Sequence, residues 1–368
     1  MSVMTQSATP LEPGQILCPY CLETMRYDEA RLFRRSETLQ YERLDPSELT
    51  NALKRPDILR VAFQSCAGDG TSEPHYVPVP YLTNGRPLTV AMIGASGSGK
   101  SHLLTQMVAE VIDGGLKPYG VKWQSVNHAD HSQFVRERVA RLRQGRQLEA
   151  TGQTSFAEFV EALLLTGADG QVRPVAFFDL GGEDLLRTDS LLRFLLGVDA
   201  LVFVVDPLLA LRMPQLDEPR RQARLTVTGS DPAFDTVLDR LPHSGGYLNV
   251  ASALVVGKAD LLRFEPPVDR WLTDDASDTV FDPRLLQEES RDAYAFLSRH
   301  AGPGWLRPFD SALRCTLHFA SATGGSAQDN TFPHGVRSRR VLGPLVSVLA
   351  MCGMLTKDAR PSAAVAGG

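Results

Sequence analysis

The chain has 368 residues, of which 43% are hydrophobic, and a net charge of −5 at neutral pH. This length allows one large domain with appendages or two domains, and the slightly acidic balance argues against a protein that binds nucleic acid. No apolar run reaches the roughly 18 residues that a bilayer crossing needs, no signal peptide is evident, and five cysteines fit a cytoplasmic protein without a disulfide framework.

The N-terminal part of the chain is punctuated by cysteine and proline. Residues 1–13 are polar and are predicted to be disordered, and residues 14–85 form a region with short helix and strand patterns. Within this region, Pro74, Pro78 and Pro80 suit neither a helix nor a central strand. The stretch that holds them is therefore predicted to be a connector.

The segment Cys18-Pro19-Tyr20-Cys21 has the C-x-x-C spacing of a zinc knuckle. A structural zinc site needs four ligands, and the sequence has no second C-x-x-C. Cys66 and His75 are the nearest pair that completes a set, so these four side chains are the predicted zinc ligands. The alternatives are a ribbon that has lost its metal, or a metal-free turn with free thiols.

Strands alternate with helical patterns from residue 86 to residue 356. This alternation predicts an α/β domain with a doubly wound, mostly parallel sheet. The predicted strands are 88–93, 120–126, 156–165, 172–180, 200–205, 251–256 and 315–319, and the predicted helices are 101–112, 132–143, 189–196, 233–241, 287–300 and 339–355.

Three stretches depart from this alternation. Strands 156–165 and 172–180 follow one another without a helix, and Asp169-Gly170 between them is a hairpin signal, so they are predicted to form an antiparallel pair at one edge of the sheet. Residues 206–248 are rich in charge, proline and glycine and are predicted to be an insertion. The tail 357–368 is predicted to be disordered.

The strongest motif is a phosphate-binding loop of the form G-x-x-x-x-G-K-[ST] at residues 94–101. A predicted strand enters it and a predicted helix leaves it, which is the context that such a loop requires. Its glycines let backbone N–H groups surround phosphate oxygens, Lys100 would reach the β- and γ-phosphates, and the Ser101 hydroxyl would ligate Mg2+. The residues expected to bind nucleotide here are Gly94, Ala95, Ser96, Gly97, Ser98, Gly99, Lys100, Ser101 and His102.

Three shorter patterns follow the phosphate-binding loop, each at the end of an apolar strand. Asp179-Leu180-Gly181-Gly182 has the form D-x-x-G, in which the acidic side chain holds Mg2+ through water. Gly257-Lys258-Ala259-Asp260 ends a later strand, and Ser321-Ala322-Thr323 ends the last one. Each pattern is weak alone, but their order along the chain is informative.

The order GASGSGKS, DLGG, GKAD and SAT resembles the P-loop GTPases over residues 88–353. The resemblance implies that Asp260 binds the guanine base, that the stem of Lys258 lies along it, and that the backbone at Ser321 and Ala322 faces guanine O6. The first residue of the third motif is usually Asn or Thr but is Gly in this chain, so a P-loop ATPase without guanine recognition remains an alternative.

The same resemblance implies residues that respond to the γ-phosphate. The Gly182 N–H would contact this phosphate directly. A switch threonine is expected between the phosphate-binding loop and the strand that ends at Asp179, and Thr154 is preferred to Thr151 because it lies closer to the start of the preceding strand. Thr154 would join Ser101 and Asp179 around Mg2+.

Glu183 stands where many GTPases carry a glutamine that orients water. A carboxylate there could orient water, or it could repel the γ-phosphate and slow the chemistry, and the sequence leaves both readings open. The catalytic candidates are therefore Lys100, Thr154 and Glu183. A nucleotide-bound scaffold without significant hydrolysis is a further alternative.

A narrower resemblance covers nearly the whole chain. The phosphate-binding loop, the D-x-x-G-E motif and the N-terminal Cys-Pro-Tyr-Cys knuckle together look like the bacterial double-GTPase type, in which a GTPase domain is fused to a small metal-binding ribbon. This resemblance implies a cytoplasmic switch that uses GTP, Mg2+ and Zn2+, contains no membrane span, and works with protein partners that the sequence does not identify.

Overall fold

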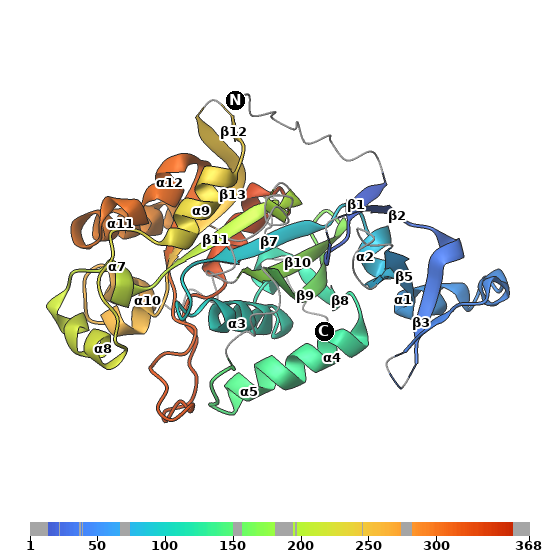
Figure 1. Cartoon of the computed structure of the whole chain (residues 1–368), viewed down its shortest axis with the longest axis horizontal. Coiled ribbons are helices and arrows are strands. Elements are labelled where there is room, and N and C mark those ends of the chain that lie inside the picture. Colours follow the sequence, from blue (N-terminus) through green and yellow to red (C-terminus); the bar gives the residue numbers. More distant parts are fainter. Residues whose placement is uncertain are drawn as a thin grey trace, which may run out of the picture.

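The computed structural model describes residues 14–21, 23–36, 38, 40–66, 74–149, 157–180, 194–195, 197–244, 246–273 and 282–355. Some predicted features lie outside these residues: the two chain ends expected to be disordered, Thr151, Thr154, Gly182, Glu183 and most of helix 189–196. In the described chain, a smaller N-terminal part with two small sheets precedes a large α/β part (Figure 1).

The α/β part is built on a sheet with eight strands in the described residues, and most neighbouring strands run parallel. The strand order is β12-β13-β11-β7-β10-β9-β8, and β14 also pairs with β13. This agrees with the mostly parallel α/β sheet predicted from the sequence. The strands are β7 (Leu88–Ile93), β8 (Lys122–Ser125), β9 (Ala157–Thr166), β10 (Val172–Leu180), β11 (Ala200–Val205), β12 (His243–Ser244), β13 (Tyr247–Val256) and β14 (Ala312–Phe319).

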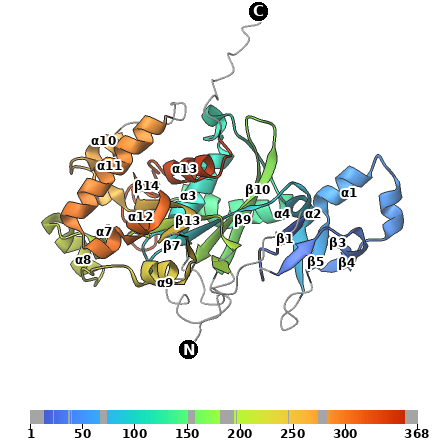
Figure 2. The ribbon, with the colours of Figure 1, turned by 90° about the horizontal axis from the view of Figure 1, so that it is seen from above.

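Helices cover both faces of this sheet (Figure 2), and this explains why its central strands are continuous apolar runs. Val90 and Val204 pack in the cluster that includes α3 and α13, whereas Ala91 and Phe203 pack with α9 and α11. The helices are α3 (Lys100–Ile112), α4 (His128–Phe134), α5 (Ala140–Arg143), α7 (Pro207–Ala210), α8 (Asp217–Gln222), α9 (Pro232–Arg240), α10 (Val268–Thr273), α11 (Pro283–His300), α12 (Arg307–Ser311) and α13 (Gly343–Met351), with a π-helical turn joining α4 to α5.

The predicted hairpin is present, but its position in the sheet differs from the prediction. β9 and β10 pair antiparallel, with Val172 opposite Thr166 and Leu180 opposite Ala157. β9 is not an edge strand, because β8 pairs with its other side, also antiparallel. The physical reason is that β8 is short and alternates exposed and half-buried residues, which suits an edge, whereas β9 is long and mostly apolar and needs a neighbour on each side.

The N-terminal part contains more regular structure than the sequence predicts. β1 (Gln15–Leu17) and β2 (Thr24–Arg26) form a hairpin, and a second, antiparallel sheet has the order β4-β3-β5-β6. The stretch expected to be a connector forms strand β6 and helix α2, because Pro78 ends a strand at the sheet edge and Pro80 lies in the first turn of a helix, where proline is tolerated. The remaining elements are β3 (Leu32–Arg35), β4 (Tyr41–Arg43), β5 (Phe63–Cys66), β6 (His75–Pro78), α1 (Arg55–Val61) and α2 (Val79–Thr83).

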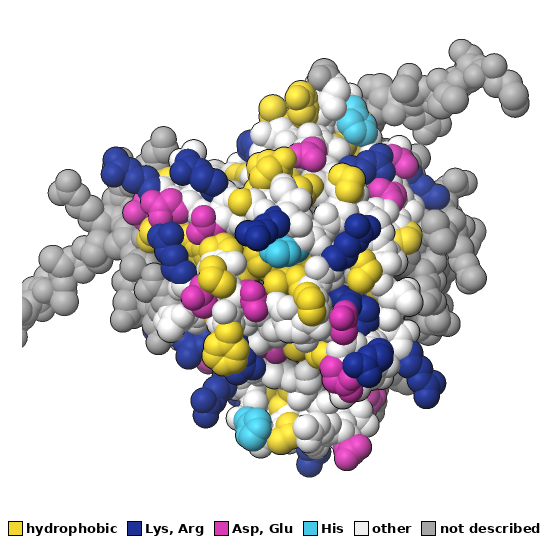
Figure 3. All heavy atoms as spheres, turned by 90° about the vertical axis from the view of Figure 1, so that its left-hand side faces the viewer, with side chains coloured by type: hydrophobic (Ala, Val, Ile, Leu, Met, Phe, Trp, Pro, Cys, Tyr) yellow, Lys and Arg dark blue, Asp and Glu magenta, His cyan; other side chains and the backbone are white. Residues whose placement is uncertain are grey.

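The face of the molecule shown in Figure 3 carries both signs of charge. Lysine and arginine side chains alternate there with aspartate and glutamate side chains, and apolar groups lie between them. This face has no continuous basic surface of the kind that binds nucleic acid. Among the described helices, none combines the length and the apolar character that crossing a bilayer would require.

Candidate functional site

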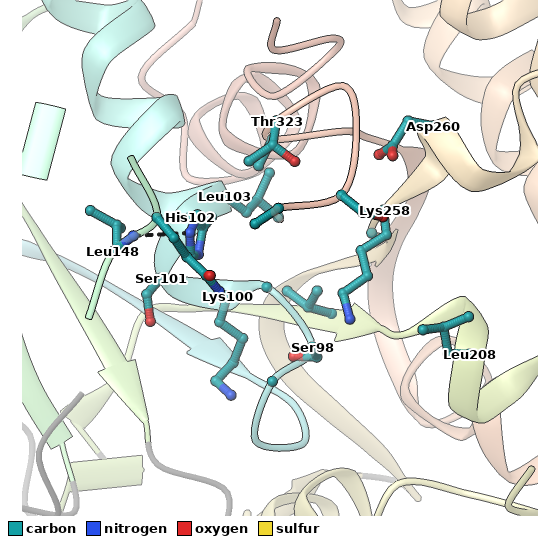
Figure 4. Close-up of a pocket in the computed structure, with 18 of the residues that line it drawn as sticks. Ser98, Lys100, Ser101, His102, Leu103, Leu148, Leu208, Lys258, Asp260 and Thr323 are labelled. Carbon is teal, nitrogen blue, oxygen red and sulfur yellow. Dashed lines mark hydrogen bonds between the residues drawn. The ribbon is translucent and has the colours of Figure 1, made fainter. Parts of the chain in front are cut away.

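A cavity of about 940 Å3 opens where the parallel strands of the large sheet end. The turns after β7, β11, β13 and β14 contribute to its walls, as do Asp179 and Leu180 at the end of β10. In open α/β sheets, ligands bind at this edge, outside the carboxyl ends of the strands. Figure 4 shows Ser98 and Lys100 at one end of the cavity, Asp260 and Thr323 at the other, and Lys258 between them.

The turn between β7 and α3 requires glycine at two positions. Gly94 has φ +155°, and a Cβ there would lie 2.7 Å from the backbone oxygen of Val204. Gly99 has φ +93° and precedes α3 without a side chain to cap it. The N-terminus of α3 therefore opens into the cavity, and its N–H groups and dipole favour an anion there.

Lys100 is held at this end of the cavity by backbone oxygens. Its Nζ donates to the carbonyls of Gly94, at 2.7 Å, and Ala95, at 2.9 Å. Burial lowers the pKa of Lys100, and the carboxylates of Asp179 and Asp231 act in the opposite direction. The ammonium is thus placed beside the turn that would surround phosphates.

Ser101 and Asp179 meet although 78 positions separate them in the chain. The Ser101 hydroxyl donates to Asp179 Oδ2. The other carboxylate oxygen, Asp179 Oδ1, and the Ser98 hydroxyl are both buried without a hydrogen-bond partner. Burial raises the pKa of Asp179. Unsatisfied oxygen atoms beside the turn between β7 and α3 are a donor set that fits Mg2+.

Two buried aspartates that the sequence analysis missed support the cavity from the insertion 206–248. Asp231 Oδ2 accepts from the N–H of Ala95 at 2.7 Å, and its Oδ1 caps α9. Asp206, which follows β11, accepts from Lys258 Nζ at 2.7 Å. Both precede a proline at a helix start, a signal that predicts a helix cap but not a contact with a distant loop.

The other end of the cavity brings two predicted motifs together. Ser321 Oγ donates to Asp260 Oδ1 at 2.5 Å, and the N–H of Gly324 donates to Ser321 Oγ at 2.9 Å. Lys258 adopts a left-handed backbone conformation with φ +47°, so its stem runs along the cavity wall. Asp260 and Ser321 thus form one polar pair, while Ala322 also lines the cavity.

The unusual Gly257 has a local explanation. A Cβ at this position would lie 3.1 Å from Val204 Cγ1, 3.4 Å from the oxygen of Val205 and 3.6 Å from the oxygen of Ser98. The turn after β13 therefore packs closely on β11 and on the phosphate-binding loop. A larger side chain would have to displace one of these neighbours.

His102, in the first turn of α3, holds the wall between the two ends of the cavity. Its Nε2 accepts from the N–H of Leu148 at 3.3 Å, and its ring contacts Phe332 edge to face. Burial and, secondarily, the nearby charge of Lys258 lower the pKa of His102 to about 4. The imidazole is therefore neutral near pH 7.

Acidification is expected to destabilise the protein partly through His102. The unfolded chain takes up a proton on this residue near pH 6.5, whereas the folded chain does so only near pH 4, so stability falls as the pH drops through this window. A pKa change from 6.5 to about 4 corresponds to about 3 kcal/mol. Denaturant unfolding of the wild type and of His102→Gln between pH 7 and pH 4 checks this. The difference in the free energy of unfolding between the two proteins should change between pH 7 and pH 4. A difference that stays constant would contradict the lowered pKa of His102.

The four predicted metal ligands of the N-terminal part lie together. Cys18 and Cys21 flank the turn after β1, and Cys66 pairs with His75 across β5 and β6. One ligand atom of each lies within 4.8 Å of all the others. Cys21 Sγ is 3.6 Å from Cys66 Sγ, and Cys18 Sγ is 3.9 Å from His75 Nδ1.

These separations are close to those of a tetrahedral metal site. With metal–sulfur distances near 2.3 Å and metal–nitrogen distances near 2.0 Å, neighbouring ligand atoms of such a site are about 3.5 to 3.8 Å apart. The Cys3His donor set is one that structural zinc sites use.

Comparison with known proteins gives matches among solved structures. No protein-family model and no curated protein sequence matches the chain. Among solved structures, the small GTPase Arl6 (BBS3) of Trypanosoma brucei, with the bound nucleotide analogue GppNp, resembles 73% of this chain over 99% of its own. The identity is 11% and the TM-score is 0.31, and a likeness this distant carries no conclusion about activity.

Proposed function

We propose that this protein binds GTP with Mg2+ and acts as a slow GTPase switch. One observation carries the proposal: a single cavity has Lys100 and the Ser101–Asp179 pair at one end and Asp260, which accepts from the buried Ser321 hydroxyl, at the other. The first end suits a triphosphate with its cation, and the second suits a base. Lys100→Met tests the phosphate end and Asp260→Asn tests the base end, with nucleotide affinity as the readout.

Guanine is favoured over adenine by the chemistry of the base end. A carboxylate is only an acceptor, and guanine presents two adjacent donors on N1 and N2, whereas adenine presents an acceptor at N1. Asp260 keeps one carboxylate oxygen on Ser321, and this bond fixes its orientation beside the cavity. The stem of Lys258 would cover one face of the base.

Turnover of the nucleotide would rest on positioning and charge rather than on covalent chemistry. Lys100 would neutralise the β- and γ-phosphates, and Ser101 would hold Mg2+ directly while Asp179 acts on it through water. In this proposal Thr154 would join the ligands of Mg2+, Gly182 would contact the γ-phosphate, and Glu183 would orient the attacking water. A nucleotide-bound scaffold would bind GTP as well but release no phosphate.

A P-loop ATPase is the second candidate, and Gly257 favours it. The usual side chain at this position contributes a hydrogen bond near the base, and the close packing around Gly257 leaves little room for it. In that case the cavity would bind ATP and GTP with similar affinity.

The N-terminal part is proposed to hold Zn2+ on Cys18, Cys21, Cys66 and His75. The separations of the four ligand atoms support this, as does the resemblance of the chain to the bacterial double-GTPase type. On this proposal the protein is a cytoplasmic GTPase with a structural zinc ribbon, and a protein partner reads its nucleotide state.

The purified chain is expected to contain one Zn2+, and its removal by a chelator is expected to lower the thermal midpoint by at least about 5 °C, because binding energy at a structural zinc site contributes to folding. Elemental analysis and thermal unfolding check this. Cys21→Ser should lose the metal, and Cys352→Ser, which changes a cysteine outside the cluster, should keep it. A metal-free wild type that also shows no thiolate absorption band with Co2+ would contradict the site.

A further inference from the structure

A buried charge cluster outside the cavity is centred on Glu289 of α11. Arg340 donates to this carboxylate twice, with 2.7 Å from Nη2 to Oε2 and 3.2 Å from Nε to Oε1, and His318 Nδ1 lies 3.1 Å from Oε2. Burial alone would raise the pKa of Glu289, but His318 and Arg340 outweigh it and hold the pKa at about 2. Glu289 is therefore an ionised, fully buried and well-paired carboxylate.

This cluster fixes both ends of the loop that follows β14. At its start, the N–H of Phe319 donates to Glu289 Oε1 at 3.1 Å. At its end, Arg340 binds the same carboxylate. Between these points Ser321 and Arg339 exchange two backbone hydrogen bonds, of 3.0 and 2.8 Å, which close the stem of the loop. Glu289 thus holds together two chain segments that are 21 positions apart.

The loop that Glu289 holds carries half of the base end of the cavity. Ser321 lies in its first turn and donates to Asp260. Arg340 also contacts the segment that carries Asp260. Its guanidinium lies 5.1 Å from the ring centre of Trp271 in α10, the helix that follows Asp260 in the chain. The two segments that form the base end therefore meet behind the cavity at the Glu289–Arg340 pair.

We propose that Glu289 is a positioning residue for base recognition, an inference that rests on the proposed binding of GTP. It acts through Arg340 and Phe319, which set the place of Ser321, and Ser321 in turn orients the Asp260 carboxylate toward the base. The phosphate end is held by bonds of its own: Lys100 donates to the carbonyl of Gly94, and Ser101 donates to Asp179 of β10. Loss of Glu289 thus affects the base and spares the phosphates.

The test compares the affinities of Mg–GTP and Mg–ATP for the wild type and for Glu289→Gln by calorimetry. The variant keeps the shape of the side chain and loses the charge that binds Arg340. We expect the Kd for GTP to rise about 10-fold, or about 1.4 kcal/mol, while the Kd for ATP stays within twofold, so that the preference for GTP largely disappears. Glu288→Gln is the matched control, since Glu288 is the neighbouring residue of α11 and pairs with Arg270 at the surface.

A merely structural role of Glu289 would lower the thermal midpoint and leave the ratio of the two affinities unchanged. Equal changes for GTP and ATP, or no change for either, would therefore overturn the inference. If Glu289→Gln does not fold, Arg340→Lys is the second variant, because lysine keeps the positive charge but cannot make both hydrogen bonds to Glu289. The ratio of the Kd values for GTP and ATP is then compared between this variant and the wild type. A wild type without preference for GTP contradicts the proposed function itself, whereas a wild type with preference and a variant that retains it contradicts only the role of Glu289.

Discussion

Replacing Lys100 with methionine is expected to weaken the binding of Mg–GTP at least about 100-fold, or about 2.7 kcal/mol. The Lys100 ammonium is a buried cation at the proposed phosphate end of the cavity, and it donates to the carbonyls of Gly94 and Ala95, which keep it in place. Charged hydrogen bonds to phosphate oxygens are among the strongest in proteins. Methionine keeps most of the volume of the side chain, so the loss should appear in affinity rather than in folding.

Calorimetric titration of the variant with Mg–GTP measures this loss. Lys117→Met serves as the control, because Lys117 is an exposed lysine that lies outside the cavity lining. The thermal midpoint of Lys100→Met should stay near that of the wild type or rise, since a buried charge is removed. Unchanged GTP affinity in a folded Lys100→Met protein would rule out the phosphate-binding role of this turn.

Asp260→Asn is expected to change the preferred base from guanine to xanthine. The carboxylate would accept from the N1 and N2 groups of guanine, whereas an amide presents a donor that matches the O2 carbonyl of xanthine. The affinity for GTP should fall at least about 100-fold, about 2.7 kcal/mol, and the affinity for xanthosine triphosphate should rise. The bond from Ser321 can be kept by the amide oxygen, so the geometry of the pair survives.

Competition between GTP and xanthosine triphosphate for binding to the variant measures this change of preference directly. Asp57→Asn is a suitable control, because Asp57 is an exposed aspartate on α1, in the N-terminal part. Unchanged preference for GTP in Asp260→Asn would contradict the assignment of the base end. Equal losses for both nucleotides would point to a general collapse of the cavity instead.

Local sequence patterns predict the strands of the large sheet well, because each central strand is a buried apolar run that ends in a turn. The ranges 88–93, 172–180 and 200–205 agree with β7, β10 and β11 residue for residue. Parallel order also follows from the alternation with helices. The pairing of β8 outside β9 could not be predicted, because a short strand with mixed polarity carries no information about its neighbour.

The candidate site was predictable where a motif is contiguous and was missed where the contact is long-range. The phosphate-binding loop and the Cys-x-x-Cys turn are visible as short patterns. Asp231 contacts Ala95 from 136 positions away, and Arg340 binds Glu289 from 51 positions away. Such pairs depend on the packing of α9 and α11 against the sheet, so no local spacing indicates them.

Calorimetric titration of the purified protein with GTP and then with ATP, both with Mg2+, decides between a GTPase and an ATPase. We expect micromolar or tighter binding of GTP and at least tenfold weaker binding of ATP, a gap of about 1.4 kcal/mol. Equal affinities would show that Asp260 does not read the base and would favour the ATPase. Absence of binding to both nucleotides would contradict the function proposed for the cavity.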